Sequence, residues 1–238
     1  MTELPSNWTA HDAGLWSRTH ALRVGGLLPL GTRTTVLAHA DGGLLVHSPG
    51  RLTAEDHAFI RGLGEVRWLV APNREHNLFI ADAAQAFPEA EVWVAPGVEA
   101  KIPESRLSGV LTPGLDSPFG DSIDTLFIEG CPRMAETVLV HTASRTLVTA
   151  DLSFHITEAD SWLDRSMLKM AGAYGKFGPS TLFRTWYLQD RPAFKRSLDE
   201  LLERDFDRVV LAHGRPLEMG GKLALESILV GRLLGLLR

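Results

Sequence analysis

The chain has 238 residues, of which 45% are apolar and 22% are charged, a composition typical of a globular protein and a length that suits one domain over residues 1–238. The net charge is -5 and the Lys and Arg residues are scattered, which argues against a nucleic-acid partner, while the single cysteine excludes an intramolecular disulfide and fits a reducing compartment. The polar, acidic N-terminus indicates no signal peptide, and no window of about 18 apolar residues indicates a membrane span, so we expect a cytoplasmic protein.

The first half of the chain predicts a β-rich start over residues 19–47, followed by alternating helices and strands. Residues 34–40 and 44–47 flank Asp41-Gly42-Gly43, a sequence typical of a hairpin turn. Thr53 is a suitable helix N-cap and Gly64 a suitable terminator, which predicts a helix over 52–63. The next expected elements are a strand at 66–70, a helix at 77–87 and a strand at 91–95.

The second half begins with residues 103–122, which are rich in Pro, Gly and Ser and are expected to form an irregular insertion. The elements expected after it are a strand at 123–129, a hairpin of 136–141 and 146–150, helices at 160–173, 179–187 and 192–204, a strand at 208–212 and a helix at 221–237. Because the last helix is rich in Leu, we expect it either to pack deeply on a sheet or to form a homodimer contact.

Three apolar strands each lead into side chains that can bind a metal. Glu75 and His76 follow one strand, Asp151 follows another, and His213 follows the last. The carboxyl ends of strands are where α/β sheets gather ligands and catalytic groups. If these ends converge, two carboxylates and two imidazoles form a site for zinc, manganese or ferrous iron.

Each of these residues also has a simpler role open to it. Glu75 can complement the dipole of the following helix, Asp151 can form a turn, and His213 can be an ordinary loop residue. His141 can be a buried hairpin residue, and Cys131 can be a small buried residue, as well as an additional ligand.

The order of these motifs resembles that of the metallo-β-lactamase superfamily over residues 20–215. The family's His-x-His-x-Asp-His motif corresponds here to Ala71-Pro72-Asn73-Arg74-Glu75-His76, and its Gly-His-Thr-Pro-Gly turn corresponds to Gly130-Cys131-Pro132. Thr149-Ala150-Asp151 matches the family's Asp after a strand, and Leu211-Ala212-His213-Gly214 matches its final His. The resemblance implies an α+β fold, the four-layer αββα sandwich.

The same resemblance implies that one of two family metals has lost its ligands. The positions of its three His residues hold Ala71, Asn73 and Cys131. The other ligand set is kept, with Glu in place of Asp. We therefore expect a single divalent metal, zinc in preference to manganese or iron. Its expected ligands are Glu75, His76, Asp151 and His213.

Metallohydrolases of the superfamily activate water to cleave an ester, thioester, amide or phosphodiester bond, which implies a small-molecule substrate here. Since four protein ligands leave less room for water than three, either Asp151 or Glu75 is expected to act as the catalytic base. Asn73, Arg74 and His141 are candidates for binding the substrate.

Two other functions stay open. The loss of one ligand set is also what a metal-free pseudo-enzyme would show, in which the fold serves as a binding or structural protein. An iron-dependent oxidoreductase is the least favoured alternative. Such relatives use a two-iron site, and this chain lacks most of the ligands of that site.

Overall fold

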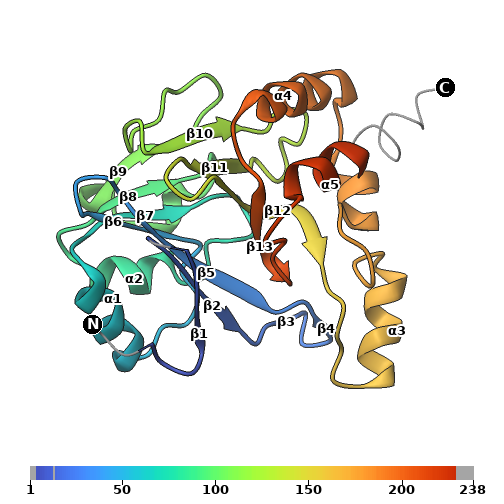
Figure 1. Cartoon of the computed structure of the whole chain (residues 1–238), viewed down its shortest axis with the longest axis horizontal. Helices are drawn as coiled ribbons and strands as arrows, with labels where there is room; N and C mark the ends of the chain where they lie inside the picture. The colour runs from blue at the N-terminus through green and yellow to red at the C-terminus, as the bar shows by residue number, and fades with distance from the viewer. Residues whose placement is uncertain (1–3, 13, 229–238) are drawn as a thin grey trace.

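A computed structural model describes residues 4–12 and 14–228 of the chain, and in it two sheets lie face to face with helices on their outer sides (Figure 1). The first sheet contains, in spatial order, β1 (Trp8–Asp12), β2 (Leu15–His20), β5 (Thr32–Ala38), β6 (Leu44–His47), β7 (Val66–Ala71), β8 (Glu91–Val94) and β9 (Leu107–Val110). The second contains β10 (Ile123–Phe127), β11 (Thr137–His141), β12 (Thr146–His155) and β13 (Arg208–Gly214). A short separate hairpin consists of β3 (Arg23–Val24) and β4 (Leu28–Pro29).

The helices of the described residues divide between the two outer faces and one end of the molecule (Figure 1). They are α1 (Ala54–Leu63), α2 (Ile80–Ala86), α3 (Trp162–Met170), a π-helix (Phe183–Tyr187), α4 (Arg191–Glu203) and α5 (Gly221–Ile228), with 3₁₀ turns at Glu99–Lys101 and Glu104–Arg106. In Figure 1, α1 and α2 lie beside the first sheet, α4 and α5 beside the second, and α3 beside the β3–β4 hairpin.

Three apolar layers hold this arrangement together. Val46 and Leu69 belong to the layer between the first sheet and its helices, whereas Leu45 and Val70 belong to the layer between the two sheets. This alternation follows from the period of two residues along a strand. A third layer, around Phe194, joins the second sheet to α4 and α5. The fold is therefore the four-layer αββα sandwich that the motif order implied.

Helix α1 shows how local sequence sets these elements. The Thr53 side chain accepts a hydrogen bond from the backbone of Asp56, and the Asp56 carboxylate accepts one from the Thr53 backbone over 2.7 Å, which forms a capping box. Gly64 follows the helix as its C-cap. The predicted caps and the predicted end of this helix are confirmed, and the helix begins at Ala54, two residues later than expected.

Several boundaries differ from expectation. The stretch 103–122 is not wholly irregular, because Leu107–Val110 adds β9 to the edge of the first sheet. The helix expected at 77–87 is shorter, at Ile80–Ala86, and the segment at 179–187 forms a π-helix from Phe183. The last helix packs Leu225 and Ile228 inward. Its expected continuation to residue 237 lies outside the described residues, and the homodimer stays a prediction.

None of the helices in the described part of the chain is long and apolar enough to cross a membrane.

Parallel pairing brings the ends of several strands to one edge. β6, β7, β8 and β9 run parallel to one another, as do β12 and β13. The β12–β13 register is irregular between Thr149 and Phe154. Irregularities of this kind commonly redirect a side chain next to a functional site. Asp151 lies inside this irregularity. Because β12 is longer than expected, Asp151 lies within the strand, whereas the prediction placed it directly after the strand.

Candidate metal centre

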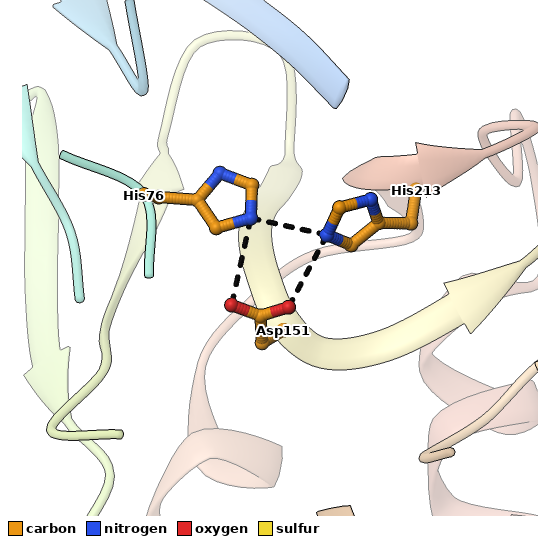
Figure 2. Close-up of side chains that lie close together, drawn as sticks. All are labelled: His76, Asp151 and His213. Carbon is orange, nitrogen blue, oxygen red and sulfur yellow. Dashed lines mark hydrogen bonds and ion pairs between the residues drawn. The ribbon is translucent and has the colours of Figure 1, made fainter. Parts of the chain in front are cut away.

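His76, Asp151 and His213 converge at this edge, where their potential ligand atoms all lie within 4.8 Å of one another (Figure 2). The two Nε2 atoms of the imidazoles are 3.1 Å apart. Asp151 Oδ1 lies 3.2 Å from His213 Nε2, and Asp151 Oδ2 lies 3.5 Å from His76 Nε2. The convergence predicted from three strand ends therefore exists for these three residues.

His213 is held on three sides. Its Nδ1 lies 2.8 Å from the carbonyl oxygen of Gly31, which can only accept, so Nδ1 carries a proton and Nε2 faces the cluster, where a neutral imidazole offers a lone pair. The ring of Phe154 stacks on the imidazole at 4.8 Å between centroids. The buried guanidinium of Arg33 donates to the carbonyls of Leu211 and Gly214, on either side of His213, and fixes the backbone there.

His76 is oriented by a serine in an unusual backbone conformation. Ser48 follows β6 with φ of 51°, which non-glycine residues adopt at a cost in energy, and its Oγ lies 2.7 Å from His76 Nδ1. A Ser-Pro-Gly sequence at a strand end carries no specific signal for this role.

Asp151 supplies the charge of the cluster. Burial by itself would raise the pKa of its carboxyl group, but the nearby His76 and His213 imidazoles hold that pKa below its usual range. The carboxylate is therefore ionised and available to a cation.

The geometry of the three side chains fits a metal ion. Ligands bound to zinc at about 2.0–2.1 Å in a tetrahedron are about 3.3 Å apart. The two Nε2 atoms are 3.1 Å apart, and each lies 3.2 or 3.5 Å from a different oxygen of Asp151, which is close to that separation. Three protein ligands leave a fourth position free for water or substrate, the arrangement typical of catalytic rather than structural zinc sites.

Glu75 does not join the cluster, contrary to the expected ligand set. Its exposed carboxylate accepts a hydrogen bond from the Tyr187 hydroxyl over 2.8 Å, at the end of the π-helix. Burial and the adjacent Glu75 charge raise the pKa of Tyr187. Both residues line the cavity beside the cluster, so Glu75 faces the cavity without belonging to the three-residue cluster.

Asn73 is fully buried and cannot touch a substrate, which corrects its predicted role. Its Nδ2 donates to Asp151 and to Glu136, over 2.8 and 3.2 Å, and its Oδ1 accepts from the backbone amides of Glu75 and His76. All four hydrogen-bonding positions of this amide are used. Asn73 therefore ties the loop that carries His76 to the strand that carries Asp151.

Glu136 is another residue of the site that the sequence by itself did not indicate. It is completely buried and accepts from the backbone amides of Ala150 and Asp151, over 2.7 and 2.8 Å, as well as from Asn73. Burial and the Asp151 charge raise its pKa. A lone acidic residue directly before an apolar strand was the available signal.

The other candidates lie apart from the cluster. His141 is buried between the backbone oxygen of Ala38 and the Ser144 hydroxyl, away from the cluster. The predicted contact of His141 with a substrate is therefore wrong. Cys131 is buried in the apolar layer around Phe194. Arg74 lines the cavity, and its Nε donates to the carbonyl of Pro96 over 2.7 Å.

A cavity of about 400 Å³ opens beside the cluster. His76, Asp151 and His213 line it together with Glu75 and Tyr187. Its size is in the range of small-molecule sites in proteins. The three converging side chains are therefore accessible to a ligand of modest size.

Comparison with solved structures places the chain among proteins of the metallo-β-lactamase fold. The DIM-1 metallo-β-lactamase exposed to ceftazidime matches with a TM-score of 0.61 and 12% identity, over 94% of this chain and 97% of that one. A metallo-β-lactamase from Pontibacter korlensis matches with a TM-score of 0.61 and 14% identity, over 94% and 99%. The mono-zinc form of FIM-1 from Pseudomonas aeruginosa matches with a TM-score of 0.60 and 11% identity, over 95% and 98%.

A family model described as a domain of unknown function, DUF4336, matches residues 26–163, more than half of the chain. The chain belongs to that family. No curated protein matches it.

Proposed function

We propose that this chain is a hydrolase that depends on one divalent metal, with His76, Asp151 and His213 as its ligands. The carrying observation is that two imidazole Nε2 atoms face each other at 3.1 Å beside an ionised carboxylate. On His213 the other nitrogen, Nδ1, donates to Gly31, so a neutral imidazole presents the lone pair of its Nε2 to the cluster. Such a group of donors is stabilised by a cation between them.

A divalent ion bound there, zinc before manganese or iron, lowers the pKa of water and polarises a carbonyl or phosphoryl oxygen. The mono-zinc form of FIM-1 supports a single-metal site, since it is a fold neighbour described with one zinc. The bond cleaved is an ester, thioester, amide or phosphodiester of a small molecule.

Glu75 is the catalytic base in this proposal. Its carboxylate lines the cavity, is exposed, and is free of the ligand cluster. The Tyr187 hydroxyl occupies one oxygen, Oε1, and holds the carboxylate in place, so the other can take a proton from the attacking water. Asp151 remains a ligand, because Asn73 and the two imidazoles surround its carboxylate.

Elemental analysis of the purified chain tests the metal. We expect about one equivalent of metal in the wild type, and at least a tenfold loss in His76→Ala and in His213→Ala. His57→Ala is the matched control, because His57 lies on α1 and outside the cluster. A wild-type chain that binds no metal after reconstitution contradicts the proposal.

The metal-free pseudo-enzyme is the second candidate, and one observation favours it. The 3.1 Å between the imidazole Nε2 atoms is also a hydrogen-bond distance, so a proton on His76 could satisfy the pair without a metal. In that case the wild type and His213→Ala both contain only background metal, and the substitution lowers only the free energy of unfolding. Hydrolysis of model esters that chelation abolishes and zinc restores would exclude this candidate.

A further inference from the structure

We propose that the cavity beside the cluster binds an anionic amphiphile, with an apolar chain in the cavity and an anionic headgroup at Arg74 and Lys101. The position of the scissile bond rests on the proposed function, but binding itself does not. Three sets of observations lead to this ligand class: the lining of the cavity, its rim, and two cations at its edge.

The lining away from the cluster is mostly apolar. Its buried members include Phe154, Ala173 and Phe183. Leu28 and Leu30, from the segment around β4, pack against the same small apolar group as Phe154. A wall of this kind excludes polar groups and favours an aliphatic chain or ring.

The rim continues the apolar lining out to solvent. Val24, Leu78 and Leu182 line the cavity while remaining 50%, 63% and 55% exposed. They come from three different elements, namely the β3–β4 hairpin, the loop before α2 and the segment before the π-helix. Single exposed apolar residues are ordinary, but three around one cavity mouth indicate an apolar ligand that passes between them.

Arg74 and Lys101 provide positive charge that is in no direct ion pair within the described part of the chain, in a cavity that the Glu75 carboxylate also lines. Both line the cavity, and none of the carboxylates in residues 4–12 and 14–228 forms an ion pair with either. Both are nevertheless held in place. Lys101 Nζ donates to Asn77 Oδ1 over 2.6 Å, and Asn77 Nδ2 donates to the Arg74 carbonyl. The buried Asn77 amide therefore joins Lys101 to the backbone of Arg74, while the Arg74 guanidinium is held separately by the carbonyl of Pro96.

The backbone at Gly97 adds to this arrangement. Gly97 has φ of 90°, and a Cβ built there would lie 2.8 Å from Arg74 Nε. The guanidinium thus packs against a position that only glycine can occupy. Preorganised cations lose little entropy when an anion binds.

A second cleft differs from this cavity in how its cations are paired. It has a volume of about 450 Å³ and lies between residues 113–117, β10 and α4. Its two cations, Arg196 and Arg204, already pair with Glu129 and with Asp124. That cleft therefore presents no comparable unpaired charge to an anion.

Binding of short amphiphiles tests the inference, measured by calorimetry on the purified full chain and again after chelation, so that a headgroup cannot simply coordinate a metal. From hexanoate to decanoate we expect Kd to fall about threefold to fourfold for each added methylene. Decanoate and monodecyl phosphate are both used, because either anion can pair with the two cations. Binding of either supports the inference, and the tighter one identifies the headgroup. Decyltrimethylammonium should bind at least tenfold more weakly.

Variants separate the two parts of the site. Arg74→Gln combined with Lys101→Gln should raise Kd for decanoate at least tenfold and leave Kd for decanol unchanged, whereas Leu78→Ser combined with Leu182→Ser should weaken both. Lys195→Gln and Leu223→Ser are the controls, since the half-buried Lys195 and the exposed Leu223 both lie outside the cavity. Kd without chain-length dependence, or equal affinity for the cationic amphiphile, overturns the inference. If the chain binds the amphiphile but holds no metal and shows no turnover, the inference stands and the proposed hydrolase function fails.

Discussion

The Asn73 amide donates from Nδ2 to the Asp151 carboxylate over 2.8 Å and thereby joins two segments that each supply part of the cluster. Asn73→Ala removes this link and leaves the Glu136 and Asp151 carboxylates with one donor fewer. We expect a loss of about 2–3 kcal/mol in the free energy of unfolding and of 10- to 100-fold in metal affinity.

Ser144→Ala is the control for this variant. Ser144 is also buried and hydrogen-bonded, to His141 and Thr146, but it lies away from the cluster. It should lose stability and keep its metal affinity, as measured by denaturant unfolding and competitive chelation. Equal metal affinity in both variants would contradict the role given to Asn73.

Ser48 combines a hydrogen bond to His76 with a positive φ of 51°, and two substitutions separate these effects. Ser48→Ala and Ser48→Gly both remove the hydroxyl, so both should lower metal affinity by a similar factor. Only glycine relieves the backbone, so Ser48→Gly should unfold with a free energy about 1 kcal/mol higher than Ser48→Ala. Thermal unfolding of the metal-free variants measures the difference, and equal stabilities would show that the backbone there is unstrained.

Tyr187 holds Glu75 through its hydroxyl, so Tyr187→Phe should disturb catalysis without disturbing the metal. We expect kcat to fall about tenfold, since a positioned base contributes about 10²–10⁴-fold and the phenyl ring preserves the packing. Metal content should stay at the wild-type value. A parallel loss of metal would instead place Glu75 among the ligands.

His20 predicts a pH dependence of stability. Burial, and then the charge of Arg18, lower its pKa to about 4, whereas unfolded His titrates near about 6.5. Between these values the unfolded state binds more protons, so the stability present above about pH 6.5 is lost as pH falls toward about 4. In the presence of chelator, His20→Gln should lose less stability than the wild type over this window. An unchanged slope in denaturant titrations would rule out the assignment.

Cys131 should be chemically silent in the folded chain. Burial, with a contribution from Glu136, raises the pKa of its thiol to about 12, and only 1% of the residue is exposed. We expect no reaction with a thiol reagent at pH 8 until denaturant is added, and unchanged metal content in Cys131→Ala. Rapid labelling of the native protein would place Cys131 at the surface.

Much of the fold could be read from local pattern. Alternation of apolar residues predicted most strands, and Thr53 and Gly64 predicted the ends of α1, because caps and side-chain periodicity act over a few residues. The edge strand at Leu107–Val110 was missed because Pro, Gly and Ser surround it and pairing with β8 supplies the order that its composition does not.

For the site, the sequence by itself determined that His76, Asp151 and His213 lie in or shortly after apolar strands, since local pattern is enough to find such strands. Tertiary structure alone decided where each neighbouring side chain points. Glu75 turns to Tyr187, His141 lies between Ala38 and Ser144, and Asn73 and Glu136 become the buried link behind the cluster. Apart from Ser144, which lies three residues from His141, these partners are 63 to 112 residues away along the chain, and no short-range pattern encodes contacts of that separation.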